Sequence, residues 1–110
     1  MHTGKVVYLA GKITGDKNAV EKFALLTSVL EKHGALVLNP LYIPYGLKQE
    51  DYMDICFAMI RASSTCCFIS DWSESEGAVA EYHYAKKIRK ELLTICNKSQ
   101  CINILHVDRG

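Results

Sequence analysis

The segment KVVYLAGKITGD, residues 5–16, decides the fold class of this chain. Residues 5–10 form a short, mostly apolar run that stops at Gly11, and a loop with a second glycine follows it. Continuous short apolar runs are typical of strands that are covered on both faces, as in parallel sheets. We therefore predict a buried strand over residues 5–10 and a loop over residues 11–16.

Similar runs recur along the chain and alternate with segments whose apolar residues have helical spacing. We predict further strands over residues 35–39, 65–70, 92–96 and 102–107, and helices over residues 17–33, 49–62 and 77–90. Strands that alternate with helices indicate a mostly parallel sheet with helices on both faces. The predicted fold class is therefore α/β, a Rossmann-like or flavodoxin-like three-layer sandwich with four or five strands, formed by a single domain over residues 1–110.

The helix ends carry residues of the types that cap helices. Asp16 is predicted to cap the first helix, and Gly34 to end it. Ser75 precedes the third helix and is predicted to cap it. Together with Gly77, Ser75 also forms a Ser-x-Gly pair, which can instead hold a phosphate at a helix start.

The composition excludes several classes of protein. Apolar residues make up 49% and charged residues 23% of the chain, as in globular domains. Thirteen basic and twelve acidic residues give a net charge of +1, which lacks the basic excess of a nucleic-acid binder. Because no run of about 18 apolar residues exists, we expect no membrane-spanning helix. We expect a cytoplasmic protein that binds neither nucleic-acid polymers nor membranes.

The five cysteines show no spacing typical of a zinc site. We interpret them mainly as free, buried thiols that pack in the core. A disulfide between Cys96 and Cys101 is the alternative, and it is disfavoured in a reducing compartment.

Ligands of such α/β folds bind at the carboxyl ends of the strands, where three predicted loops meet, over residues 11–16, 40–48 and 71–76. The first loop contains the pattern Gly11-x-x-x-Gly15, which is either a turn that requires glycine or an anion site at a helix N-terminus. Asp71 ends the third strand and is expected to point into this rim. Trp72 follows it and either stacks on a bound base or covers the core.

Two helical carboxylates are candidates for chemistry. Glu81 shares one helical face with Ala78 and Ala85, and small residues indicate a face packed closely on the sheet. A carboxylate there is costly to bury unless it is paired or used, so Glu81 is either functional or reaches solvent at the edge of that face. Asp54 lies beside an apolar face near the start of the second helix, where the helix dipole also favours an acid.

Three blocks of the sequence together resemble the nucleoside 2-deoxyribosyltransferase superfamily. They are Tyr8-Leu9-Ala10-Gly11, the segment DICFAMIRA that begins at Asp54, and the segment GAVAEYHYA over residues 77–85. The resemblance covers about residues 5–96. It is strongest to small phage and bacterial deoxyribosyltransferase-like proteins, which are related to 2′-deoxynucleoside 5′-phosphate N-hydrolases.

The resemblance implies roles for three side chains. Glu81 matches the nucleophile that attacks the anomeric carbon and forms a covalent glycosyl-enzyme. Tyr8 matches the residue that orients this carboxylate, and Asp54 matches the acid near the leaving base. Two carboxylates in one partly dry pocket would have different pKa values, and we expect Glu81 to be the ionised one.

The resemblance also implies a substrate-binding set. Ser75 and Gly77 match the pair that holds a 5′-phosphate in the N-hydrolases. Gly11, Lys12 and Ile13 lie in the loop where those hydrolases carry an arginine, and Lys12 can supply that charge. Asp71 completes the predicted set at the rim. No cofactor and no metal is implied.

The function implied is cleavage or transfer of the N-glycosidic bond of a nucleoside or its 5′-monophosphate, in a homodimer or larger assembly. Asn103 and His106 are candidates for completing the site of a neighbouring subunit. The alternative is a non-catalytic protein that binds a nucleotide or an ADP-ribose-type ligand. His83 stands where the family often has glycine, and its bulk is expected to alter helix packing or close part of the pocket.

Overall fold

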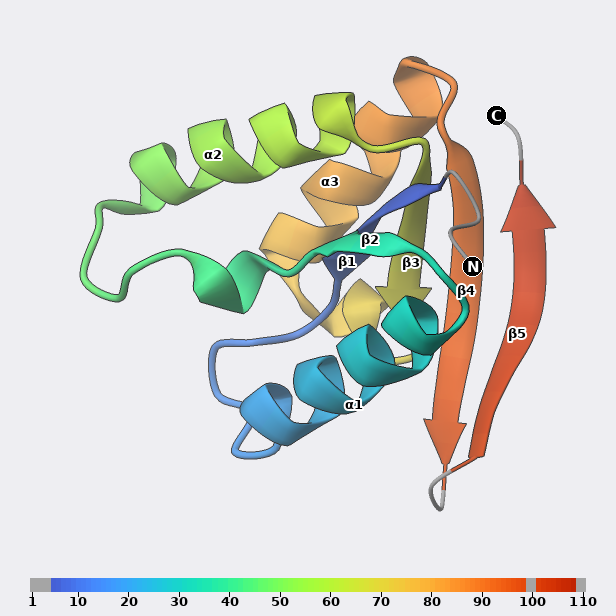
Figure 1. The fold of residues 1–110 in the computed structure, drawn as a ribbon. Coiled ribbons are helices and arrows are strands. Elements are labelled where there is room, and N and C mark those ends of the chain that lie inside the picture. The colour runs from blue at the N-terminus through green and yellow to red at the C-terminus, as the bar shows by residue number, and fades with distance from the viewer. Residues whose placement is uncertain (1–4, 99–100, 109–110) are drawn as a thin grey trace.

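A computed structural model describes the backbone of residues 5–98 and 101–108 and the side chains of residues 5–95. Its elements are the strands β1 (Val6–Ala10), β2 (Leu36–Leu38), β3 (Thr65–Ile69), β4 (Glu91–Lys98) and β5 (Cys101–Asp108), and the helices α1 (Ala19–Lys32), α2 (Gln49–Ala62) and α3 (Glu76–Lys87). The strands form one sheet in the order β2-β1-β3-β4-β5 (Figure 1). The first four are parallel and β5 is antiparallel, which confirms the predicted α/β fold.

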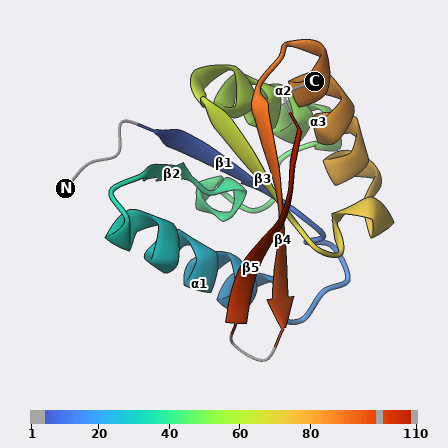
Figure 2. The same cartoon turned by 90° about the vertical axis from the view of Figure 1, so that its right-hand side faces the viewer.

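The helices cover both faces of the sheet. Helix α1 lies on one face, and α2 and α3 lie on the other (Figure 2). Side chains of β1 alternate between these layers, as the pleat of a strand requires. Val7 and Leu9 pack with Phe23 of α1, whereas Tyr8 and Ala10 pack in the core beneath α2 and α3. Tyr8 therefore points to the layer that also contains the third helix.

The strand order places a crevice beside β1. The chain leaves β1 for β2 over one face and returns to β3 over the other, so the connections diverge between β1 and β3. Ligands of open parallel sheets bind at such a point, outside the carboxyl ends of the strands. The loops over residues 11–18 and 70–75 both begin at this edge.

The start of α1 differs from the prediction. Asp16 does not cap the helix; Asn18 holds the cap position without a side-chain hydrogen bond. The Asp16 carboxylate instead accepts a hydrogen bond from the Asn18 N–H at 2.8 Å and pairs with Lys22. An aspartate that binds the backbone two residues onward forms its own turn, which delays the helix. The predicted stop at Gly34 is confirmed, and Gly34 has a φ of 88°.

Helix α3 ends three residues before its predicted end at residue 90. Arg89 adopts a φ of 63°, and the Lys90 N–H donates to the Ala85 carbonyl at 3.0 Å. Glycine usually occupies the left-handed position of such an ending. Because arginine stands there, the sequence does not signal where the helix stops.

Two predicted loops each contain one turn of 3₁₀ helix, over Pro40–Tyr42 and Trp72–Glu74. Asn39 organises the first turn, because its Oδ1 accepts from the Leu41 N–H at 2.9 Å. Its Nδ2 donates to Thr27 Oγ1 at 3.1 Å and ties the turn to α1. Asn39 is 4% exposed, so this buried amide has partners for both ends.

Cys56, Cys66 and Cys67 are free and buried, as predicted. The side chains of Cys96, Cys101, Asn103 and His106 lie outside the described residues. Within the part of the chain that the structure describes, no helix has the length and apolar character needed to cross a bilayer.

Gly11 provides a test of packing at the end of β1. A Cβ atom at this position would lie 3.1 Å from Cβ of Ile69 and 3.4 Å from Cζ of Phe23. We expect Gly11→Ala to lower the free energy of unfolding by about 1–3 kcal/mol, because the surrounding core cannot expand without strain. Urea unfolding measures this change.

Gly77→Ala is the matched control. Apart from the backbone of its own helix, the nearest atom to a Cβ at Gly77 would be Ser75 Oγ at 3.9 Å. Alanine also favours helix over glycine by up to about 1 kcal/mol, so this variant should be as stable as the wild type or more so. Equal losses in both variants would contradict the packing argument.

Candidate functional site

A cavity of about 630 Å³ opens at the carboxyl end of β1. Its walls come from β1, the following loop, the segment that contains Pro40 and Tyr45, helix α2 and the start of α3. The predicted site residues that line it are Tyr8, Gly11, Lys12, Ile13, Ser75, Gly77 and Glu81. Asp54 and Asp71 do not line it. The cavity has the size of a small-molecule site.

Glu81 reaches the cavity because of the face of α3 on which it lies. Ala78 and Ala85, one turn before and after it, are 3% and 0% exposed. These small side chains allow α3 to approach the sheet closely, and Glu81 between them faces the cavity. The face predicted from the sequence is therefore the buried one.

Burial alters the acidity of Glu81. Loss of hydration raises the pKa of this carboxyl to about 7, while the Tyr8 hydroxyl and the Cys56 thiol oppose the shift. Both groups can donate toward a carboxylate and so favour its charged form. Near neutral pH, Glu81 is therefore present in both its protonated and its ionised forms.

The hydroxyl of Tyr8 faces the same site. Tyr8 is 0% exposed, and its Oη lies near Glu81 and Cys56 but makes no hydrogen bond of standard geometry among the described residues. Burial first, and then the nearby Glu81, raise the pKa of Tyr8 well above its ordinary value. The group therefore stays neutral and offers a donor, which is costly to leave unpaired unless a ligand or water meets it.

Asp54 is not beside Glu81, which corrects the expected pair of carboxylates. Asp54 is exposed, and the α2 residue that meets Glu81 is Cys56. Cys56 and Ile60 form the buried face of α2, and Asp54 is rotated from Cys56 by about 200° around the helix. Glu81 is expected to be the ionised acid, and its raised pKa of about 7 leaves it ionised only in part near neutral pH.

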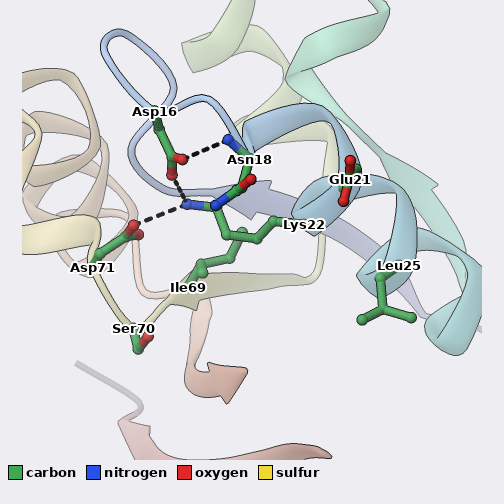
Figure 3. A pocket seen from close by; sticks show the side chains of 8 residues that line it. All are labelled: Asp16, Asn18, Glu21, Lys22, Leu25, Ile69, Ser70 and Asp71. Atoms are coloured by element: carbon green, nitrogen blue, oxygen red, sulfur yellow. Dashed lines mark hydrogen bonds and ion pairs between the residues drawn. The ribbon is translucent and has the colours of Figure 1, made fainter. Parts of the chain in front are cut away.

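Asp71 belongs to a separate hollow of about 450 Å³ on the α1 side (Figure 3). Its Oδ2 accepts from Lys22 Nζ at 2.9 Å, and Lys22 also pairs with Asp16. Burial lowers the pKa of Lys22, but these two ion pairs outweigh burial and raise it overall. Asp71 therefore joins the loops after β1 and β3 at the edge where it was expected, but it lies outside the lining of the 630 Å³ cavity.

The glycine loop and the start of α3 form the polar rim of the cavity. Lys12 Nζ pairs with Glu74 Oε1 at 3.2 Å. Ser75 caps α3 as predicted, since its Oγ accepts from the Ala78 N–H at 3.2 Å. Gly11 approaches Ile69 closely, and Gly15 has a φ of 79°, so backbone demands account for both glycines.

Trp72 covers the core and lies outside the cavity lining. Its ring stacks on Tyr82 at 4.6 Å with an interplanar angle of 17°, and it meets the edge of Phe68. His83 is exposed and also lies outside the lining. The expectation that His83 closes part of the pocket is therefore wrong, because its side chain leaves α3 on the solvent side.

The chain matches a protein family over residues 5–94, under the description "Domain of unknown function (DUF4406)". It belongs to the DUF4406 family. Among curated proteins, no sequence matches it.

Solved structures resemble the fold of this DUF4406 protein. One is a 2-deoxyribosyltransferase from the psychrotolerant bacterium Bacillus psychrosaccharolyticus, with a TM-score of 0.70 and 16% identity, over 89% of this chain and 77% of that one. Another is a heterocyclase solved with substrate and cofactor, with a TM-score of 0.52 and 15% identity, over 96% of this chain but only 12% of that one. The first similarity confirms the deoxyribosyltransferase-like fold that the sequence blocks suggest.

Several cavity residues of the DUF4406 protein escape sequence reasoning. Cys56 could have been found from its i,i+4 spacing to Ile60, which marks the buried face of α2. Tyr45 and Glu74 come from loops, and no periodic signal identifies them. Among the described residues, no cluster of three or more His, Cys, Asp or Glu side chains is arranged to hold a metal ion.

The raised pKa of Glu81 predicts a pH-dependent stability. Between pH about 4.5 and 7 the folded state binds more protons at Glu81 than the unfolded state, so stability falls as the pH rises through this range. At pH 8 the buried charge costs about 3 kcal/mol. The free energy of unfolding of Glu81→Gln minus that of the wild type should therefore increase by about 2–3 kcal/mol from pH 5 to pH 8, as measured by urea unfolding.

Glu31→Gln is the control for this measurement, because it makes the same chemical change at an exposed position of α1. Its effect on stability should stay within about 0.5 kcal/mol across the same range. An advantage of Glu81→Gln that is equal at pH 5 and pH 8 would contradict the buried ionisable state.

Proposed function

We propose that this DUF4406 protein cleaves or transfers the N-glycosidic bond of a nucleoside or nucleoside 5′-monophosphate, through a covalent glycosyl intermediate on Glu81. The observation that carries the proposal is a half-buried carboxylate that faces a ligand-sized cavity beside a buried tyrosine hydroxyl. The fold shared with a 2-deoxyribosyltransferase supports the same conclusion.

The chemistry follows from the two side chains. The bond between the anomeric carbon and the base nitrogen breaks with development of positive charge on the sugar, which an ionised carboxylate stabilises. An oxygen of Glu81 then bonds to the anomeric carbon, and the departing base keeps the electron pair and takes a proton from water. Water or a second base completes the reaction and releases Glu81.

Tyr8 is proposed to hold Glu81 in position. Its buried hydroxyl can donate to the carboxylate oxygen that does not attack, and its rigid place in β1 fixes that direction. The loss of hydration that raises the pKa of Glu81 has two opposite effects on its reactivity. A weakly hydrated carboxylate is a better nucleophile, but only its ionised fraction reacts.

The assay is release of free base, followed by chromatography, from the common 2′-deoxynucleosides and their 5′-monophosphates, with and without a second base. We expect the wild type to release base and Glu81→Gln to lose at least about a thousandfold in rate, because the nucleophile is absent. Glu31→Gln should retain the rate. A new nucleoside would identify a transferase, and free sugar a hydrolase.

In the same assay, Asp54→Asn tests whether Asp54 takes part in the reaction, as the sequence resemblance implies, or lies outside the site, as its position on α2 indicates. Its exposed carboxylate lies outside the cavity, so the variant should keep its rate within a few-fold. A loss as large as that of Glu81→Gln would restore the role that the sequence resemblance implies for Asp54.

The absence of Asp54 from the cavity is the observation that favours the second candidate function, a protein that binds a nucleotide or ADP-ribose-type ligand without turnover. A binding protein needs no acid at the leaving base. Ligand-dependent stabilisation in the wild type, with no release of base from any substrate, would support this second function and contradict the first.

The pH dependence of kcat/KM provides an independent prediction. The value should rise between pH 5 and pH 7 and level off above the Glu81 pKa of about 7. Because the Cys56 thiol lowers that pKa, Cys56→Ala should move the midpoint to higher pH.

Cys67→Ala is the matched control, since Cys67 packs on the opposite face of the sheet, toward α1. It should change the midpoint by less than Cys56→Ala does, even where both variants lose stability. Equal midpoints in the Cys56 variant and the wild type would show that the thiol does not act on Glu81.

A further inference from the structure

The described lining of the cavity contains more acidic than basic side chains. Lys12 is the one basic residue in its described lining, whereas Glu74, Glu76 and Glu81 are all acidic. A nucleoside 5′-phosphate carries a charge of about −2 at neutral pH, and placing it there would oppose several carboxylates. An uncharged sugar hydroxyl meets no such opposition and can donate to them.

The lysine that a phosphate would need is already paired. Lys12 Nζ lies 3.2 Å from Glu74 Oε1, with 33% and 63% of the two side chains exposed. The neighbouring Lys22 is not a substitute, because it is held by Asp16 and Asp71 in the separate hollow.

The start of α3, the other natural place for an anion, is also occupied by the chain itself. The Ala78 N–H donates to Ser75 Oγ at 3.2 Å, which satisfies a donor that an anion would otherwise use. Glu76 in the first turn adds a negative charge where the helix dipole favours one. Ser75 Oγ is thus engaged as a cap, and Glu76 places a negative charge beside the N–H groups that remain free at this helix start.

We propose that Glu74 is a specificity-determining residue, which engages Lys12 and so selects nucleosides that lack a 5′-phosphate. This inference rests on the proposed function for the identity of the ligand. It concerns the charge of that ligand and not the fate of its glycosidic bond, so the two can be tested separately.

The test uses binding first, measured by calorimetry on Glu81→Gln, which is expected not to consume the ligand. The probes are 2′-deoxynucleosides, the matching 5′-monophosphates and inorganic phosphate, at low ionic strength where charge effects are largest. In a Glu74-containing protein, the nucleoside should bind at least about tenfold more tightly than its monophosphate, and phosphate should not compete.

Adding Glu74→Gln should shift the affinity ratio toward the monophosphate by about five- to tenfold, because it frees Lys12 and removes one negative charge. A further Lys12→Gln change should abolish that gain. Glu31→Gln, an exposed acid on α1, should leave the ratio unchanged. The conservative Glu74→Asp should keep most of the original preference.

The outcomes separate this inference from the proposed function. A preference for nucleosides without any base release by the wild type would support the inference and contradict the proposed reaction. Base release with tighter binding of monophosphates would support the reaction and overturn the inference. A ratio that Glu74→Gln does not move would also overturn it, and so would the failure of every probe to bind.

Discussion

The central strand β1 imposes the constraint on which the rest of the structure depends. From Val7 to Ala10 its residues are at most 3% exposed, and it pairs with a strand on each side. Its two faces must therefore be filled by different helices. The pleat assigns Leu9 to the α1 side and Tyr8 to the side of α2 and α3. A shift of one residue in the register would move the Tyr8 hydroxyl out of the cavity.

The site lies on the side of the sheet covered by α2 and α3, and it costs folding free energy. Placing the Glu81 carboxylate under a closely packed helix removes water from it, and neither Tyr8 nor Cys56 restores all of the lost hydration. A core built only for stability would contain an apolar residue here. Retaining an acid at this position is consistent with a group whose charge is used.

Much of this arrangement could be read from the sequence, because burial follows periodicity. The continuous apolar runs identify β1 and β3, and the alanines around Glu81 identify the inner face of α3. Periodicity did not place Asp54 correctly. Its neighbours suggested an apolar face, but the buried face of α2 is centred on Cys56, which lies about half a turn away.

Other features depend on contacts between distant segments, and no local pattern reports them. The pairing of Lys12 with Glu74 joins residues 62 positions apart. The pKa of Glu81 depends on how much water the assembled layers exclude. The sequence alone does not report this exclusion, so it could not predict how far the pKa rises. The end of α3 at Arg89 is likewise hidden, since the residue in the left-handed conformation is not a glycine.

The bridge from Lys22 to Asp16 and Asp71 has a mechanical consequence for the cavity. It fastens the loop after β1 to the loop after β3 on the α1 side (Figure 3). Tyr45, on the far wall, has a fully exposed side chain, and the chain turns beside it at Gly46 with a φ of 100°. The two sides of the cavity are therefore fixed by different forces: ion pairs hold the loop after β1, whereas the segment that contains Tyr45 is held to α2 by the Tyr52 hydroxyl, which donates to the Pro44 carbonyl and accepts from the Leu47 N–H.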